Sequence, residues 1–160
     1  MLKNVTSGNA VAPTRDTDGM DKLPLATGAA HAARGALLLR VLGVIGCLAV
    51  AAIHVLDQGG LPGTKDPHYV QIMYYALEVA GVAAATLLLT RPARAGWVIA
   101  AGVAAGPILG YILSRGPGLP NYTDDIGNWA EPLGVFSLVV EGVLLILAAA
   151  ALLTPGRRTA

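Results

Sequence analysis

The stretch LGVFSLVVEGVLLILAAAALL, residues 133–153, is apolar throughout except for Ser137 and Glu141. A helix needs about 20 mainly apolar residues to cross the hydrocarbon core of a bilayer. Three other stretches meet this requirement, namely residues 36–56, 69–89 and 95–113. Only 13% of the 160 residues are charged, and the mean hydropathy is +0.60. We therefore predict an all-α membrane protein, a bundle of four transmembrane helices.

The remaining residues form short loops and two polar ends. Residues 1–35 begin with a segment rich in Gly, Thr, Asp and Pro that lacks an apolar period, which predicts a disordered tail. Residues 36–154 are the predicted four-helix transmembrane domain, and residues 155–160 are a short C-terminal tail. The single cysteine excludes an intrachain disulfide, and a net charge of +1 gives no reason to expect nucleic acid.

Basic residues predict the orientation in the membrane, because Lys and Arg concentrate in short cytoplasmic loops. Five arginines flank the spans on one side: Arg34, Arg91, Arg94, Arg157 and Arg158. The opposite side carries two basic and five acidic residues: Lys65, Arg115, Asp57, Asp66, Asp124, Asp125 and Glu131. We predict a multi-pass protein of the cell membrane with both termini cytoplasmic and both longer loops outside.

The two outer loops share a motif. GLPGTKD at residues 60–66 and GLPNYTD at residues 118–124 both fit G-L-P-x-x-x-D. Each loop leads into a span that carries one glutamate, Glu78 or Glu141. The match predicts an internal repeat, two tandem in–out–in hairpins, which is a known way of building membrane folds. A chance match of common loop residues is the alternative.

Helix capping explains part of the polar content of these loops. The positions suited to capping are Asp66 before Pro67 and Asn128 three residues before Glu131. Capping does not explain Asp124 and Asp125, since adjacent carboxylates repel each other. We predict that Arg115, the only arginine at this end, pairs with one of these two aspartates.

A metal site is an alternative use of the outer polar residues. His54 and Asp57 lie three residues apart, on one face of a helix. Together with His68 they offer nitrogen and oxygen ligands for a divalent metal or a copper ion. No HxxxH or CxxC pattern supports the site, and a lone histidine commonly serves as an interfacial hydrogen-bonding group.

Glu78 and Glu141 fall near the middle of their spans. An acidic residue at this depth faces the bundle interior and indicates a functional site. Each has a polar residue four positions earlier on the same helix face, Tyr74 or Ser137. A structural hydrogen-bonded pair and a proton- or cation-handling site both fit. If the repeat holds, the two glutamates face each other, and at least one is protonated at pH 7.

A glycine stripe marks the third span. Gly102, Gly106 and Gly110 recur every four residues. Small residues with this spacing favour close helix packing, so we predict that a neighbouring helix lies against the stripe.

Together these features define a candidate ligand or ion site. Its residues are His54, Asp57, Tyr74, Glu78, Tyr111, Arg115, Asp124, Asp125, Trp129, Ser137 and Glu141. We expect a non-enzymatic accessory subunit or scaffold whose outer cap binds a small ligand or a partner protein, with a homo-oligomer as another option. A metal- or proton-handling site of a redox or transport system is the alternative. No catalytic residue is assigned, because the serines lack the spacing of a triad.

Several segments resemble those of one group of proteins. The segments are GYILSRGPGLP at residues 110–120 and DDIGNWAEPLG at residues 124–134, with His54 ending the first span and Glu141 in the last. The chain from about residue 36 resembles small four-span integral membrane proteins of high-GC Gram-positive bacteria, which are generally left uncharacterised. The resemblance implies a bacterial four-span topology and carries no activity, cofactor or catalytic residue.

Overall fold

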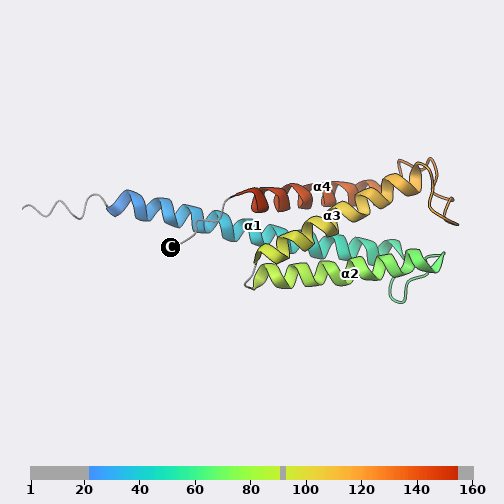
Figure 1. Ribbon diagram of the computed structural model, residues 1–160, viewed down its shortest axis with the longest axis horizontal. Helices are drawn as coiled ribbons and strands as arrows, with labels where there is room; N and C mark the ends of the chain where they lie inside the picture. Colours follow the sequence, from blue (N-terminus) through green and yellow to red (C-terminus); the bar gives the residue numbers. More distant parts are fainter. Residues whose placement is uncertain (1–21, 91–92, 155–160) are drawn as a thin grey trace, which may run out of the picture. The chain divides into compact units, whose positions relative to one another are not determined.

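The computed structural model describes residues 22–90 and 93–154 (Figure 1). Its elements are α1 (Lys22–Asp57), α2 (His68–Leu89), α3 (Ala93–Arg115) and α4 (Pro132–Leu153), and the described residues form no named strand. Each helix contains a segment long and apolar enough to cross a membrane. The predicted fold class is therefore confirmed, and the protein is a multi-pass helical membrane protein.

The chain divides into two units, Met1–Gly35 and Ala36–Ala160, at the predicted start of the transmembrane domain. The structure differs from the prediction in residues 22–35, which are helical rather than disordered. Alanine is the strongest helix former, and residues 29–36 (AAHAARGA) are rich in it. The disorder predicted for residues 1–21 and the tail at residues 155–160 lie outside the described residues.

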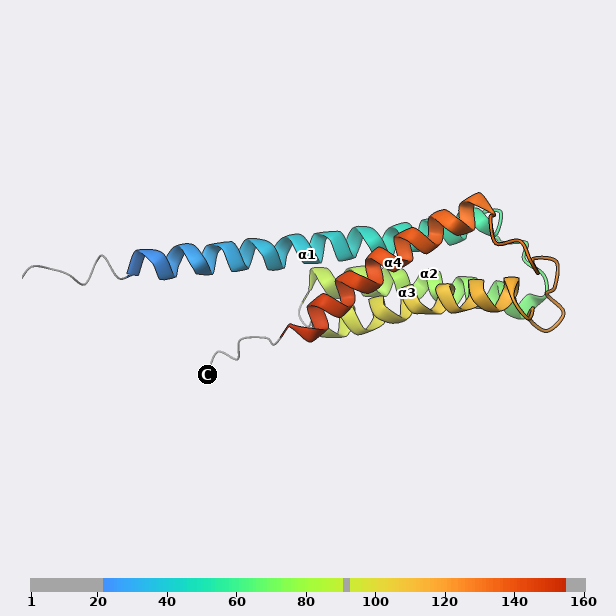
Figure 2. The same cartoon turned by 90° about the horizontal axis from the view of Figure 1, so that it is seen from above.

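Within the second unit, α3 packs against both α2 and α4, and the two views agree on this arrangement (Figures 1 and 2). Small residues bring α1 close to its neighbours. A Cβ atom added at Gly81 of α2 would lie 3.0 Å from the backbone carbonyl oxygen of Cys47 in α1. One added at Gly46 of α1 would lie 3.0 Å from Cδ1 of Leu144 in α4. Glycine thus allows α1 and α2 to approach almost backbone to backbone, and it lets the Leu144 side chain of α4 pack onto α1.

The core of the bundle is made largely of small and aliphatic side chains. Its fully buried members are Cys47, Val50, Ala84, Leu88, Ala100, Ala104, Leu144 and Ala148, which come from all four helices. Because so many of them are alanine, the helices pack closely along this part of the bundle.

The glycine stripe of α3 does not form the predicted helix contact. A Cβ atom added at Gly102, Gly106 or Gly110 would meet no atom within 4 Å. The prediction of a helix packed on this stripe is therefore wrong. Four-residue spacing of glycine makes one face of a helix smooth, but it does not determine what covers that face.

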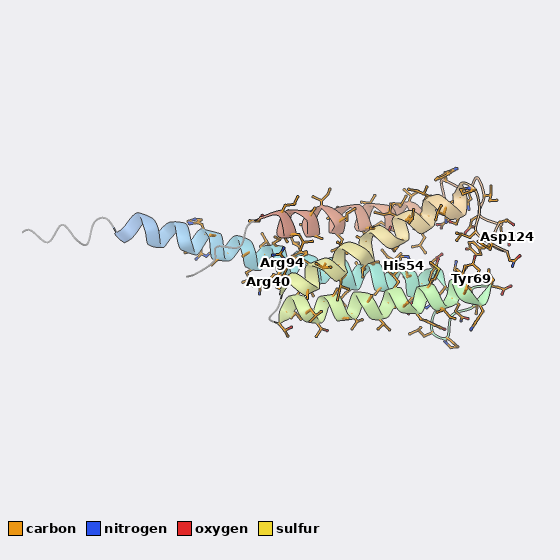
Figure 3. All side chains as sticks on the ribbon, viewed as in Figure 1. Arg40, His54, Tyr69, Arg94 and Asp124 are labelled. Carbon is orange, nitrogen blue, oxygen red and sulfur yellow. The ribbon has the colours of Figure 1, made fainter. Side chains whose placement is uncertain are left out.

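The bundle has two chemically different ends. We call the end that holds the connections at residues 58–67 and 116–131 the loop end. Figure 3 shows Tyr69 and Asp124 at the loop end, Arg40 and Arg94 toward the opposite end, and His54 between them.

Tyrosine hydroxyls hold the loop backbone to the helices. The Tyr75 hydroxyl accepts a hydrogen bond of 2.8 Å from the Gly63 amide in the first loop. The Tyr69 hydroxyl donates one of 2.8 Å to the carbonyl of Pro120 in the second loop. The concentration of aromatic residues at this end therefore orders the loops.

The predicted N-caps are one to three residues too early. The N-cap of α2 is Pro67, and no side chain caps that helix, so Asp66 is not the cap. The N-cap of α4 is Glu131 and not Asn128. Glu131 precedes Pro132, which is the first residue of the helix. Proline suits this first position because its φ is already helical and the amide that it lacks would have no partner there.

Candidate functional site

A cavity of about 370 Å³ lies among the four helices near the loop end. Its polar lining consists of His54, Asp57, Tyr74, Tyr111, Ser114, Arg115, Tyr122, Glu131, Ser137 and Glu141. The lining residues that are exposed are Met73 and Ala76 of α2 and Gly106 of α3. The cavity therefore opens between α2 and α3.

Most of the predicted site residues come together here. Seven line the cavity: His54, Asp57, Tyr74, Tyr111, Arg115, Ser137 and Glu141. Asp125 and Trp129 contact lining residues from outside. Asp124 is exposed, and it does not line the cavity.

Several lining residues were not among the predicted site residues. Tyr122 and Ser114 reach the cavity, and Glu131 lines it in addition to capping α4. Gly106 and Gly110 also line it, because their lack of side chains leaves this space open. The glycine stripe is the sequence feature that could have indicated the cavity, but we interpreted it as a contact with a neighbouring helix.

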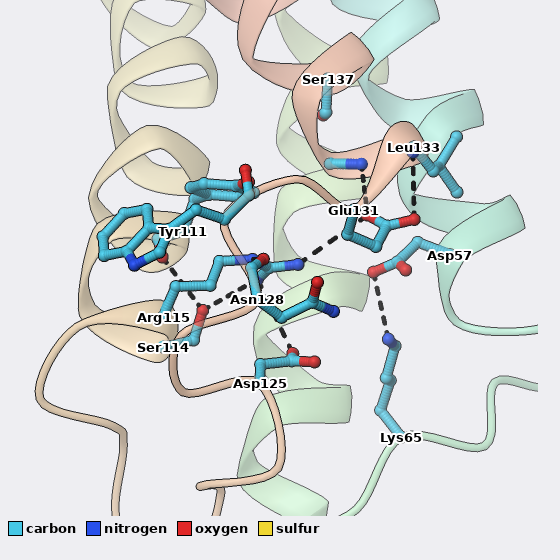
Figure 4. A network of polar contacts seen from close by, with 12 residues as sticks. Asp57, Lys65, Tyr111, Ser114, Arg115, Asp125, Asn128, Glu131, Leu133 and Ser137 are labelled. Carbon is cyan, nitrogen blue, oxygen red and sulfur yellow. Dashed lines mark hydrogen bonds and ion pairs between the residues drawn. The ribbon is translucent and has the colours of Figure 1, made fainter.

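Arg115 organises one side of the cavity (Figure 4). Its Nη1 donates a hydrogen bond of 3.0 Å to the Ser114 hydroxyl, and its Nε donates one of 3.3 Å to the carbonyl of Asn128. Its Cζ lies 4.0 Å from the centroid of the Tyr111 ring, which is a cation–π contact. The Tyr111 hydroxyl in turn donates to the Trp129 carbonyl at 2.7 Å. The second loop is thus held to the end of α3.

Two carboxylates balance the charge of Arg115. Its guanidinium lies 3.7 Å from Asp125 and 3.8 Å from Glu131, and its side chain is only 13% exposed. The predicted pairing with Asp125 is confirmed as an ion pair, but both distances exceed a hydrogen bond.

The reason for the long ion pairs is that other donors already hold both carboxylates. Oδ2 of Asp125 accepts a hydrogen bond of 2.8 Å from the Tyr122 hydroxyl. The Glu131 carboxylate accepts from the amides of Leu133, at 3.0 Å, and Gly134. Burial, followed by the hydrogen bond to Asp125, raises the pKa of Tyr122, so this phenol stays a donor.

Asp57 occupies another side of the cavity. Its Oδ2 lies 3.1 Å from Nζ of Lys65, which comes from the first loop, and it accepts a hydrogen bond from the Tyr74 hydroxyl. The Tyr74 hydroxyl therefore donates its hydrogen bond to Asp57, and the predicted Tyr74–Glu78 pair is not formed.

Glu141 lies deeper in the cavity and is only 1% exposed. Its Oε1 accepts a hydrogen bond of 2.6 Å from the Ser137 hydroxyl, which confirms the predicted pair. Nε2 of His54 lies 3.9 Å from the same oxygen, beyond hydrogen-bonding distance. Nδ1 of His54 lies 2.9 Å from the Val50 carbonyl oxygen. Because a carbonyl oxygen only accepts, Nδ1 carries a hydrogen.

Glu78 lies apart from this cavity. Its Oε1 accepts a hydrogen bond of 2.6 Å from Nε2 of Gln58, and it lines a separate depression among apolar side chains. The predicted arrangement of Glu78 facing Glu141 is therefore wrong. On α2 the cavity is lined by Val70, Met73, Tyr74, Ala76 and Leu77. Glu78 lies beyond this face of the helix and hydrogen-bonds to Gln58 instead.

The predicted metal ligands do not form a cluster. Among the described residues, no group of three or more His, Cys, Asp or Glu side chains is placed to hold a metal ion. His54 and Asp57 line the cavity, whereas His68 is exposed and does not. The predicted metal site of His54, Asp57 and His68 is therefore wrong.

The fold and the cavity together define a class of protein: a small multi-pass membrane protein with a polar cavity inside a four-helix bundle. No protein-family model, curated protein or solved structure matches the chain.

Proposed function

We propose that this is a non-enzymatic membrane protein that binds a small ligand in the cavity near its loop end. The observation that carries the proposal is the cavity itself, about 370 Å³ in volume and lined by charged and tyrosine side chains from all four helices. Charged groups inside a transmembrane bundle are costly and mark functional sites. Pockets of a few hundred Å³ with a small number of placed polar groups are typical of small-molecule sites.

The serines of the cavity support a binding role over a hydrolytic one. The Ser137 hydroxyl donates its hydrogen bond to Glu141, and the Ser114 hydroxyl donates to the carbonyl of Tyr111. Among residues 22–90 and 93–154, neither serine has a histidine as its hydrogen-bond partner, whereas a serine nucleophile needs an adjacent base.

A screen with matched glycine variants tests the proposal. Gly110→Phe fills the cavity, whereas Gly102→Phe alters the same helix outside it, and neither position has a neighbour within 4 Å of the added Cβ. We expect library compounds that raise the unfolding temperature of the wild type and of Gly102→Phe but not of Gly110→Phe. A ligand at 100 times its Kd adds about 2.7 kcal/mol to the free energy of unfolding. A screen without such compounds would count against ligand binding.

Proton handling is a second candidate function. The 3.9 Å approach of His54 to the buried Glu141 favours it, because these are two titratable groups in one cavity. Proton flux into vesicles that contain the protein, with Glu141→Gln as the comparison, separates this candidate from ligand binding.

The setting in the membrane is also a proposal. The arginine distribution supports a location in the cell membrane with cytoplasmic termini and an outward-facing loop end. In that orientation the cavity would receive a ligand near the outer surface. The protein would act as an accessory subunit of a larger assembly or as a homo-oligomer. The repeated G-L-P-x-x-x-D motif supports a chain built by hairpin duplication, although Glu78 and Glu141 lie in different environments. The resemblance to four-span proteins of high-GC Gram-positive bacteria supports a bacterial source.

A further inference from the structure

We propose that the ligand is a small organic cation whose protonated amine lies between Glu141 and Nε2 of His54. The inference rests on the proposed function and names the chemistry of the ligand. It starts from the charges in the cavity wall and from the hydrogen bonds that each group already makes.

In the part of the chain that the structure describes, Glu141 is the carboxylate of the cavity without a lysine or arginine partner. Asp57 lies 3.1 Å from Lys65, and Glu131 lies 3.8 Å from Arg115. Among the described residues, the contacts of the Glu141 carboxyl are the Ser137 hydroxyl and the distant His54. A cationic ligand would supply the missing partner, since buried charges are normally paired.

The geometry of His54 indicates that the ligand has a hydrogen-bond donor between His54 and Glu141. Nδ1 carries a hydrogen because it faces the Val50 carbonyl oxygen, so Nε2 of the neutral ring is an acceptor. This acceptor faces Oε1 of Glu141 across 3.9 Å. One donor atom about 2.9 Å from each can reach both, and an ammonium group has three N–H bonds to offer.

The rest of the cavity suits the body of such a cation. The Tyr74 ring lies beside His54, with centroids 5.3 Å apart, and an aromatic face attracts a cation. Ile53, Leu77 and Pro107 add apolar surface. The expected ligand is therefore an amine with a compact apolar group.

Three aromatic probes of similar size test the charge requirement: benzylamine, benzyl alcohol and benzoate. Titration calorimetry on the whole protein in detergent is expected to show that benzylamine binds at least tenfold more tightly than the other two. Glu141→Gln is expected to abolish this preference. Glu78→Gln is the matched control, because it neutralises the other membrane-embedded glutamate, which lies outside the cavity.

Each alternative outcome overturns the inference. If benzyl alcohol or benzoate binds as tightly as benzylamine or more tightly, the cavity binds ligands but is not a cation site. The same conclusion follows if benzylamine binding is lost in Glu78→Gln but retained in Glu141→Gln. No binding of any probe would also reject the amine, and the library screen then decides separately whether the cavity binds ligands. If Glu141→Gln does not fold, Gly110→Phe replaces it, with loss of benzylamine binding expected and unchanged binding contradicting the proposal.

The amine has two sources, a free solute or a lipid headgroup, because the cavity opens between two membrane-spanning helices. Benzylamine titrations in phosphatidylglycerol nanodiscs, with and without phosphatidylethanolamine, distinguish them. Weaker apparent binding with phosphatidylethanolamine supports a lipid ammonium as the occupant. Unchanged tight binding supports a free amine, and both results support the cation site.

Discussion

Gly134 packs against the Arg115 side of the cavity and leaves no room for a larger residue. A Cβ atom there would lie 2.7 Å from Cε2 of Tyr111, 2.8 Å from Oε2 of Glu131 and 3.3 Å from Nη2 of Arg115. We expect Gly134→Ala to lower the free energy of unfolding by about 1–3 kcal/mol, as overpacking commonly does. Thermal unfolding in detergent measures it. Gly142→Ala is the control in the same helix, because its added Cβ meets nothing within 4 Å. Equal stability of the two variants would contradict the packing described.

Tyr122 provides a pH-dependent test at the same scale. Burial raises the pKa of this phenol above its ordinary value of about 10. Since the folded-state pKa is the higher one, the contribution of Tyr122 to stability is complete below pH of about 10 and declines as the pH rises further. We expect tyrosinate absorbance of the wild type and of Tyr122→Phe to rise equally around that pH. A smaller rise in the variant would show that Tyr122 ionises normally.

At the scale of helices, the close contact of α1 with α2 depends on Gly81. Its added Cβ would lie 3.0 Å from a backbone oxygen of Cys47, which cannot move aside as a flexible side chain can. We expect Gly81→Leu to destabilise the bundle by about 1–3 kcal/mol or more. Gly102→Leu, whose position has no neighbour within 4 Å, should unfold at nearly the wild-type temperature. A lower unfolding temperature for Gly102→Leu than for Gly81→Leu would instead support the predicted helix contact at the glycine stripe.

The sequence was sufficient to predict the four membrane-spanning segments, but neither the extension of α1 back to Lys22 nor the direction in which the side chains point. Long apolar stretches mark where helices lie, because membrane crossing is a local requirement. Ser137 and Glu141 were paired correctly since they lie four residues apart on one helix. The partners of Tyr74 and Glu78 depend on how α2 is rotated against α1, which the sequence of α2 alone does not determine.

For the whole molecule, the orientation in the membrane is a testable prediction. In a Cys47→Ala background, Asp124→Cys at the loop end and Arg94→Cys toward the opposite end provide exposed, matched positions (Figure 3). We expect a membrane-impermeant maleimide to label Asp124→Cys in intact cells and to label Arg94→Cys only after the cells are broken. The opposite pattern would place the loop end in the cytoplasm.

The central claim is that the bundle encloses a cavity that a small molecule can occupy. Cysteine reactivity at Gly110, which lines the cavity and has no neighbour within 4 Å of an added Cβ, tests it most directly. In the Cys47→Ala background we expect Gly110→Cys to react with a small methanethiosulfonate and to be protected by benzylamine. Gly102→Cys, outside the cavity on the same helix, should show no protection. An unreactive Gly110→Cys would contradict an accessible cavity, and equal rates with and without benzylamine would contradict its occupation by an amine.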